Sequence, residues 1–247
     1  MSEKMFREKL TEALSRWDLT ISEKQAEQFE QFYLNLIEWN KVMNLTAITE
    51  ENDVIEKHFL DCLAVPALLG EKEAVKNAKK IIDVGTGAGF PGIPLAIFWP
   101  EKEFVLMDSL QKRIKFLDDS AQKMGIQNVT FRHARAEELA KENGMRESFD
   151  LCVSRAVASL PVLSEYCVPF VRKGGYFLPY KAADIAEEAK SGGKALHILG
   201  ARLDDVIEYT LPGTDYGRSL LIIYKERTTA GKYPRKAGLP SKEPLGQ

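Results

Sequence analysis

A glycine-rich segment directly after a run of apolar residues is the part of this sequence best suited to bind a ligand. It reads Ile81-Ile82-Asp83-Val84-Gly85-Thr86-Gly87-Ala88-Gly89-Phe90-Pro91-Gly92. The apolar run predicts a buried strand, and the glycines predict a tight turn in which a ligand lies against the backbone. Pro91 or Pro94 suits the start of a helix, where the missing N–H of proline breaks no hydrogen bond. Strand, glycine turn and helix in this order are typical of a nucleotide-type cofactor site.

The spacing of the glycines distinguishes between two cofactors, with a purely structural turn as a third possibility. Gly87-x-Gly89-x-x-Gly92 matches the dinucleotide fingerprint, but that pattern alone is weakly specific. In the frame Asp83-x-Gly85-x-Gly87-x-Gly89, a carboxylate precedes the first glycine by two residues, as is typical of S-adenosylmethionine (SAM) methyltransferases. A carboxylate attracts the cationic SAM and repels a pyrophosphate. We therefore predict SAM as the cofactor, S-adenosylhomocysteine as its product, and a site that includes Asp83, Gly85, Gly87, Gly89 and Phe90.

An acidic residue ends the second predicted strand. Asp108 follows Phe104-Val105-Leu106-Met107, and Ser109 and Leu110 come next. An acid about 20 residues beyond a glycine loop is suited to accept hydrogen bonds from ribose hydroxyls. The alternative is that Asp108 only caps the helix that begins near Leu110. We predict the ribose role for Asp108 and place Ser109 and Leu110 in the same site.

Two further strand ends complete the predicted site. Ligands of parallel sheets bind beyond the carboxyl ends of the strands, and Arg135-Ala136-Glu137 follows the third strand. Backbone groups of Ala136 and Glu137 are therefore predicted to face an adenine, although a glutamate in a first helical turn also suits the helix dipole. Arg155, at the end of the fourth strand, is predicted to bind the cofactor carboxylate or an RNA phosphate. A structural salt bridge is the alternative for Arg155.

The strands and helices that position these residues are predicted from an alternation of short apolar runs and amphipathic segments, which begins at Lys80. Strands are predicted at 80–84, 104–108, 129–133, 149–153 and 174–178, with helices near 91–99, 111–124, 135–143 and 159–170. A helix at 181–190, interrupted at Gly192-Gly193, and a closing strand pair at 206–210 and 219–225 follow. The alternation predicts βαβ units with right-handed crossovers. The predicted fold class is α/β, a Rossmann-like SAM-dependent methyltransferase fold with a mostly parallel seven-stranded sheet flanked by helices.

The first 70 residues are predicted to form an N-terminal helical extension. Ser22 and Gln25 fit a capping box, after which aromatic and aliphatic residues recur at helical spacing. A second helix is predicted after Thr49, kinked or ended by Pro66. The predicted organisation is a helical region (1–70) packed on the main domain, a SAM-dependent methyltransferase domain (71–226) and a basic C-terminal tail (227–247).

Composition excludes several classes of protein. A net charge of -2 and a pI near 6.0 exclude a whole-surface electrostatic grip on nucleic acid, so RNA contacts must come from local basic patches. No apolar run approaches the roughly 18 residues of a membrane helix, and no secretory signal is recognisable. The three cysteines, Cys62, Cys152 and Cys167, suit neither a disulfide framework nor a zinc site. We expect a cytoplasmic protein that binds no metal and no membrane.

The end of the fourth strand indicates which kind of atom is methylated. Enzymes that methylate the amino group of adenine carry an Asp/Asn-Pro-Pro-aromatic run here, and cytosine-C5 enzymes need a Pro-Cys pair; the sequence has neither. Cys152 lies inside the predicted strand, where a thiolate is disfavoured. An acceptor such as guanine N7 needs no activation, because it carries a lone pair and loses no proton. The predicted reaction is a direct in-line displacement that depends on positioning and electrostatics, with no general base and no assigned catalytic residue.

Several segments together carry a resemblance that covers nearly the whole chain. They are residues 39–48 (WNKVMNLTAI), 57–63 (KHFLDCL), the loop at 83–92, Arg135-Ala136-Glu137, Ser154-Arg155-Ala156 and 232–238 (KYPRKAG). In these segments the chain resembles the bacterial small-subunit ribosomal RNA guanine-N7 methyltransferase family, also called glucose-inhibited division protein B. The resemblance implies methyl transfer from SAM to N7 of one guanosine in small-subunit (16S) rRNA. It also implies cofactor contacts at Gly85, Phe90, Asp108, Ala136, Glu137 and Arg155. The partner is then the rRNA or the 30S subunit, and we expect a monomer.

Two groups of residues are candidates for RNA contact. Asn44 and His58, with Asn40 and Asp61, either line a target-base pocket or form a polar network that holds the helices to the sheet.

In the tail, Lys232, Arg235 and Lys236 flank Tyr233, an arrangement suited to phosphate contacts and base stacking. The alternative is a disordered tail.

Three other functions are open at this point. A SAM enzyme for small molecules or proteins would be insensitive to RNA and leaves the basic tail without a role. A nicotinamide-dependent reductase would bind NAD(P)H instead of SAM. A noncatalytic ribosome-assembly factor would bind rRNA without methyl transfer, and the intact glycine loop argues against it.

Overall fold

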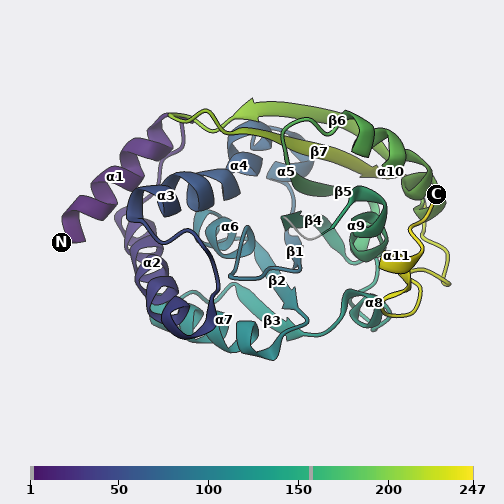
Figure 1. The fold of residues 1–247 in the computed structure, drawn as a ribbon, viewed down its shortest axis with the longest axis horizontal. Helices are drawn as coiled ribbons and strands as arrows, with labels where there is room; N and C mark the ends of the chain where they lie inside the picture. Colours follow the sequence, from purple (N-terminus) through teal and green to yellow (C-terminus); the bar gives the residue numbers. More distant parts are fainter. Residues whose placement is uncertain (1–2, 156–157, 247) are drawn as a thin grey trace.

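A seven-stranded sheet forms the centre of the molecule (Figure 1). The structure is a computed structural model that describes residues 3–155 and 158–246. Its strands are β1 Lys80–Val84, β2 Glu103–Asp108, β3 Val129–His133, β4 Phe149–Arg155, β5 Val171–Ala182, β6 Ala201–Thr210 and β7 Gly217–Lys225. The order is β3-β2-β1-β4-β5-β7-β6, with β1 to β5 parallel and β7 antiparallel to both of its neighbours. This topology confirms the predicted α/β fold with a mostly parallel sheet.

The helices cover both faces of the sheet. Those that follow the first five strands are α6 Gly92–Phe98, α7 Gln111–Met124, α8 Ala136–Leu139, α9 Leu160–Cys167 with a 3-10 turn Val168–Phe170, and α10 Ala186–Leu199. Neighbouring strand residues point to opposite faces, so Ile81 and Ile82 belong to two separate hydrophobic cores. The first core lies under α6, α7 and the N-terminal helices, and the second lies under α8, α9 and α10.

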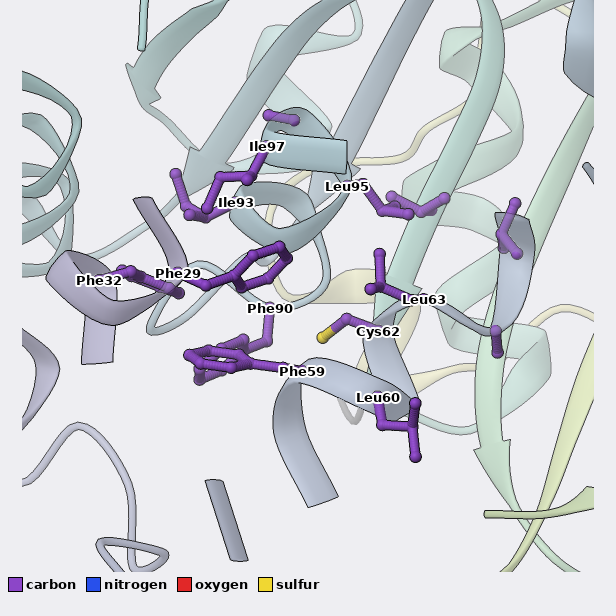
Figure 2. Packing of buried hydrophobic residues seen from close by; sticks show 14 of the residues in the cluster. Phe29, Phe32, Phe59, Leu60, Cys62, Leu63, Phe90, Ile93, Leu95 and Ile97 are labelled. Atoms are coloured by element: carbon purple, nitrogen blue, oxygen red, sulfur yellow. The ribbon is translucent and has the colours of Figure 1, made fainter. Parts of the chain in front are cut away.

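The N-terminal helices are α1 Glu3–Ser15, α2 Glu23–Met43, α3 Glu51–Val54, the π-helix η1 Ile55–Leu60, α4 Ala64–Leu69 and α5 Glu73–Lys76. Of these helices, α1, α2 and α3 lie at one side of the molecule in Figure 1, and α4 and α5 lie nearer its middle. Ser22 and Gln25 form both hydrogen bonds of the predicted capping box. The apolar face of α2 carries Phe29 and Phe32 into an aromatic cluster with Phe59 and Phe90 (Figure 2). This cluster joins the N-terminal helices to the turn that follows β1.

The helix predicted after Thr49 is interrupted at Leu63, three residues before Pro66, but it does not end at the proline, so that part of the prediction was wrong. Pro66 itself lies in the first turn of α4, which continues to Leu69. The carbonyl that a helical N–H at residue 66 would bind belongs to Cys62, and the hydroxyl of Tyr180 donates to it instead, at 2.7 Å. A first-turn proline sacrifices no bond that the helix needs.

The predicted interruption of a helix at Gly192-Gly193 was also wrong. Helix α10 begins later than predicted, at Ala186, and runs through both glycines to Leu199. A Cβ at Gly192 would lie 2.5 Å from Cδ2 of Leu160 in α9. The glycine therefore permits the close packing of α10 against α9, which outweighs its low helix propensity.

The C-terminal residues 227–246 lie beside α8 and α9, at the opposite end of the molecule from α1 (Figure 1). They include the short helix α11, Leu239–Lys242. Tyr233 and Leu245 are buried in the second hydrophobic core. The described part of the tail is therefore packed against the main body of the fold.

Candidate active site

The turn after β1 is held in place by its neighbours on β2. Gly85 and Thr86 both donate backbone hydrogen bonds, of 3.0 Å, to the carbonyl of Met107. Gly87 donates its N–H to Oδ2 of Asp108, also at 3.0 Å. Gly87 and Gly89 have φ values of +60° and +91°, a region that residues with a side chain rarely adopt. The sequence therefore dictates this backbone path directly.

The glycines of the turn serve different purposes. A Cβ at Gly89 would lie 2.8 Å from both Ile93 and Leu117, so glycine is needed there for packing. A Cβ at Gly87 would meet no heavy atom within 4 Å. Open space next to the backbone of Gly87 is what a ligand that approaches the turn requires.

Asp83 lies beneath the turn and is fully buried. Its Oδ2 accepts the N–H of Gly92 at 2.9 Å, while Oδ1 has no hydrogen-bond partner among the described residues. Burial raises the pKa of Asp83 to about 7, against the lowering effects of the Gly92 N–H and of Arg155. Asp83 thus fixes the entry to α6 and does not line a cavity.

A cavity of about 340 Å³ opens at the carboxyl ends of β1, β2 and β3, and we call it the β1–β3 cavity. Its lining includes five of the eleven predicted cofactor residues and some residues that the sequence did not indicate; Gly87, Gly89 and Phe90 of the glycine turn lie outside it. The full set is Val84, Gly85, Met107, Asp108, Ser109, Arg113, Ala134, Arg135, Ala136, Glu137 and Tyr166. The position agrees with the rule that parallel sheets bind ligands at this edge.

Asp108 contacts the start of α7, as in the alternative that the sequence left open, and it also lines the cavity. Its Oδ1 accepts the backbone N–H of Leu110 at 2.9 Å, where α7 begins. Its Oδ2 accepts from Gly87 and from Nη1 of Arg113, at 3.0 and 3.1 Å. The carboxylate is almost fully buried, yet it lines the cavity. It therefore ties the glycine turn, the start of α7 and the cavity wall together.

Glu137 and Tyr166 form the far wall of the β1–β3 cavity. Glu137 is buried, and its Oε1 accepts the backbone N–H of Gly238 at 3.0 Å. Tyr166, on α9, lines the cavity although no motif in the sequence marked it. Its apolar neighbours in α9 give it the pattern of an ordinary core residue, so only the fold reveals its position.

A second cavity, of about 570 Å³, lies over the ends of β4 and β5, and we call it the β4–β5 cavity. Residues from four separate parts of the chain line it. They are Ile48, Lys57, His58, Asp61, Arg155, Tyr180, Lys181, Ala182, Tyr216 and Arg218. Four of these side chains are cationic and one is a carboxylate. Each cation is also in an ion pair: Lys57 with Asp53, Lys181 with Glu188, and Arg155 and Arg218 with Asp61. The lining therefore offers cationic donors to an anionic ligand, with part of their charge compensated by these carboxylates.

Arg155 lies on the floor of the β4–β5 cavity and does not line the β1–β3 cavity. Its Nη1 donates to Oδ2 of Asp61 at 2.8 Å, and its guanidinium stacks over the ring of Phe90, 5.0 Å from the centroid. The structural salt bridge that the sequence left as an alternative is therefore present. Arg155 still faces the cavity, so the ion pair does not remove it from the site.

His58 is held as a neutral hydrogen-bond acceptor for Arg155. Nη2 of Arg155 lies 3.1 Å from Nδ1 of His58, and a guanidinium can only donate, so Nδ1 carries no proton. The proton is then on Nε2, which donates to Oγ1 of Thr46 at 2.9 Å. Burial and the charge of Arg155 lower the pKa of His58 to about 3. Both ring nitrogens are engaged, and the ring stacks on Phe90 at 4.4 Å.

The other predicted RNA residues do not gather around His58. Asn44 is exposed at the end of α2 and lines neither cavity. Lys232 and Lys236 are exposed on the C-terminal segment and also lie outside both linings. Arg235 is bound to Glu165 on α9, at 2.7 Å from Nη2 to Oε2. Leu110 is exposed and outside both cavities as well, and Ala156, in the predicted motif, lies outside the described residues.

The two cavities lie on either side of the paired strands β1 and β4. Ser154 donates its hydroxyl to the carbonyl of Val84 at 2.7 Å. Val84 lines the β1–β3 cavity, and Arg155, next to Ser154, lines the β4–β5 cavity. Phe90 also belongs to this region because it follows the glycine turn and contacts both His58 and Arg155.

Comparison with known proteins places the chain among its relatives. The sequence profile of the family described as GidB, rRNA small subunit methyltransferase G, matches residues 25–212. The chain belongs to this family. Ribosomal RNA small subunit methyltransferase G of Clostridium novyi (strain NT) is 46% identical over 244 residues, which cover 99% of each chain. The Clostridium tetani (strain Massachusetts / E88) protein of the same name is 44% identical, over 96% of this chain and 97% of its own.

Family membership confirms the predicted class of enzyme, a SAM-dependent methyltransferase. Among solved structures, one from Klebsiella pneumoniae described as an O-methyltransferase aligns with a TM-score of 0.52 and 15% identity. It covers 85% of this chain and 92% of its own. At that identity the likeness concerns the fold alone, and it agrees with the strand order of the sheet.

Among residues 3–155 and 158–246, no group of three or more His, Cys, Asp or Glu side chains is arranged to hold a metal ion. Within the same residues, no helix is both long enough and apolar enough to cross a membrane.

Proposed function

We propose that this chain transfers a methyl group from SAM to N7 of a guanosine in small-subunit (16S) ribosomal RNA by direct in-line displacement. The observation that carries the proposal is the presence of two cavities of different character on either side of the paired strands β1 and β4. Membership in the methyltransferase G family, over nearly the whole length of its relatives, supports both the reaction and the substrate.

The β1–β3 cavity suits SAM in size and charge. Its 340 Å³ falls in the range of about 300–1,000 Å³ typical of small-molecule sites. Asp108 and Glu137 are balanced by Arg113 and Arg135 in its lining, as befits a ligand that carries both a cation and a carboxylate. When bound, SAM supplies an electrophilic methyl group on its sulfonium. Asp108 would accept the ribose hydroxyls, and backbone groups at Ala136 would meet the adenine.

The β4–β5 cavity suits the acceptor nucleotide. Lys57, Lys181 and Arg218 line it together with Tyr216, which is 45% exposed. Lys57 lies 5.0 Å from the centroid of the Tyr216 ring, so cations and an accessible aromatic face occur side by side. Such a combination binds phosphates and stacks on bases. The N-terminal helical region then contributes much of the RNA side of the site, and the methyltransferase domain contributes the cofactor side.

The chemistry of guanine N7 fits the groups available at the β4–β5 cavity. N7 loses no proton when it is methylated, so the reaction needs no general base. His58, the histidine in the lining, has both ring nitrogens engaged and a pKa lowered to about 3, which fits a supporting role. Catalysis then depends on holding the acceptor and the methyl group at about 3–3.5 Å in line. Phe90 and Arg155 form the rigid floor for that alignment.

The proposal extends to the partner and the location. We infer a monomer that acts in the bacterial cytoplasm on rRNA or on the 30S subunit. Three buried free cysteines, Cys62, Cys152 and Cys167, suit a reducing compartment.

The decisive experiment measures methyl transfer from labelled SAM to small-subunit rRNA and to assembled 30S subunits, followed by mass spectrometry of the nucleosides. N7-methylguanosine supports the proposal, and the better of the two substrates identifies the natural one. A different methylated nucleoside would contradict the assignment of N7. Absence of transfer to both substrates, with SAM bound, would contradict the proposed substrate.

A further inference from the structure

The wall of the β1–β3 cavity formed by α8 and α9 is held from outside by the C-terminal segment, residues 227–246. Glu137 on α8 accepts the N–H of Gly238 at 3.0 Å. Tyr166 on α9 shares a hydrogen bond of 2.8 Å with the hydroxyl of Ser241. Glu137 and Tyr166 line the cavity, whereas Gly238 and Ser241 do not. The C-terminal segment therefore contacts the wall from behind.

The segment is firmly anchored on the N-terminal side of these contacts. Arg235 binds Glu165, whose side chain is fully buried, through its backbone N–H, Nε and Nη2, at distances of 2.7 to 3.1 Å. Glu165 precedes Tyr166 in α9, so this ion pair also fixes the tyrosine. Arg146 donates to the carbonyls of Thr229 and Tyr233, at 2.8 and 2.9 Å. A charge-assisted network of this kind holds its partners with little freedom.

The backbone at residue 238 is adapted to the contact with Glu137. Gly238 has a φ of +81°, a conformation that strains any residue with a side chain. A Cβ there would meet no heavy atom within 4 Å, so the requirement for glycine comes from the backbone path and not from crowding. That path aims the N–H of Gly238 at the buried carboxylate of Glu137.

We propose that the C-terminal segment is a positioning element of the cofactor cavity, whose contacts at Gly238 and Ser241 set the affinity for SAM. The inference rests on the proposed function of the β1–β3 cavity as the SAM site. Glu137 and Tyr166 each belong to a short helix that covers one end of the sheet. Without the contacts from behind, their side chains and the backbone at Ala136 have more conformations to lose when the ligand binds, which weakens binding.

The test uses two small substitutions and a matched control. Gly238→Ala disturbs the backbone that donates to Glu137, and Ser241→Ala removes the hydroxyl that meets Tyr166. Arg227→Ala alters the same segment, but Arg227 donates to the carbonyl of His197 on α10, away from the cavity wall. For each protein, SAM affinity is measured by isothermal titration calorimetry, and the melting temperature is measured without SAM.

We expect the Gly238→Ala/Ser241→Ala double variant to bind SAM about tenfold more weakly than the Arg227→Ala control, because one hydrogen bond of the wall is lost and the backbone that donates the other is strained. If the double variant is too unstable to study, Ser241→Ala alone provides the test, with a loss of a few-fold.

Two results would overturn the inference, and they are distinguishable. If the double variant melts at a lower temperature but binds SAM as tightly as the control, the segment stabilises the fold only. If the wild-type protein itself does not bind SAM, the proposed function of the cavity fails and the inference fails with it.

Discussion

Replacing Gly87 by valine should abolish SAM binding and leave the fold intact. The side chain would enter the open space beside the glycine turn, where a Cβ meets no heavy atom of the protein within 4 Å. The cost to stability is then mainly the backbone strain at a φ of +60°, about 1–2 kcal/mol for a residue with a side chain. In a chain of this length, that strain corresponds to a fall in melting temperature of roughly 2–8 °C.

Gly125 provides a matched control for that substitution. It has a φ of +64° at the end of α7, and a Cβ there also meets no heavy atom within 4 Å. Gly125→Val therefore carries the same backbone strain. Neither glycine is in a cavity lining, but Gly87 donates to Asp108, which lines the β1–β3 cavity, whereas Gly125 lies at the C-terminal end of α7. Its melting temperature should fall by a similar amount, and its SAM affinity should equal that of the wild type.

The assay is calorimetric titration with SAM at a temperature well below both melting transitions. The expected result is no measurable binding by Gly87→Val and normal binding by Gly125→Val. If both variants bind SAM equally well, the cofactor does not approach the glycine turn, and the placement of SAM in the β1–β3 cavity is refuted. If neither binds, backbone strain alone explains the loss.

Three further sets of substitutions test residues on the proposed RNA side of the site. The pKa of His58 is about 3 in the folded protein, against an ordinary value of 6.5. Its contribution to the free energy of unfolding is therefore complete above pH 6.5 and is lost as the pH falls toward 3. Between pH 7 and 5, urea denaturation should show that the wild type loses about 2 kcal/mol more than His58→Asn. Asp61→Ala should cost about 3 kcal/mol or more in urea denaturation and reduce methyl transfer, because Arg155 is left buried without its carboxylate. Lys232→Glu/Lys236→Glu should weaken RNA binding, flatten its salt dependence by roughly 0.7 log units per lost contact, and leave SAM affinity unchanged.

For each of these substitutions, a control variant or a specific outcome would contradict the expectation. Parallel pH dependences for the wild type and His58→Asn would mean that the histidine is not held neutral. Asp53→Ala breaks the more exposed ion pair with Lys57 and should cost no more than about 1 kcal/mol; an equal loss in both aspartate variants would contradict a special role for Asp61. As a control, the double variant Lys24→Glu/Lys41→Glu on α2 changes the net charge by the same amount as the tail variant. If it loses as much RNA affinity, the effect of the tail lysines comes from the net charge of the protein and not from their position.

The sequence alone was sufficient to predict the parts of the fold that a local residue pattern or a backbone requirement determines. The bounds of β1, β3 and α7 agree with the prediction, because each has a clear period and a glycine or polar residue at its end. The glycine turn could be located because few residues other than glycine adopt its φ values. Asp108 was found because its distance from that turn is fixed by the length of one helix and one strand.

Residues brought together by the sheet order could not be found in this way. Lys181, Tyr216 and Arg218 line the β4–β5 cavity only because β7 inserts antiparallel beside β5, which places residue 218 opposite residue 182. Neither their types nor their spacing forms a motif. The helix interruption predicted at Gly192 failed for a related reason, since a glycine required for packing against α9 looks the same in the sequence as one that breaks a helix.

The N-terminal helices and the sheet form one unit around Arg155, even though the chain order suggests two regions that meet near residue 70. The guanidinium belongs to β4, but its partners Asp61 and His58 come from the N-terminal region. Phe90, from the turn after β1, packs against Phe32 and Phe59 of the same region. Without these helices, Arg155 would lose both partners and the first hydrophobic core would be open to water. The groups around Arg155 at the β4–β5 cavity are thus the same groups that attach the helices to the sheet.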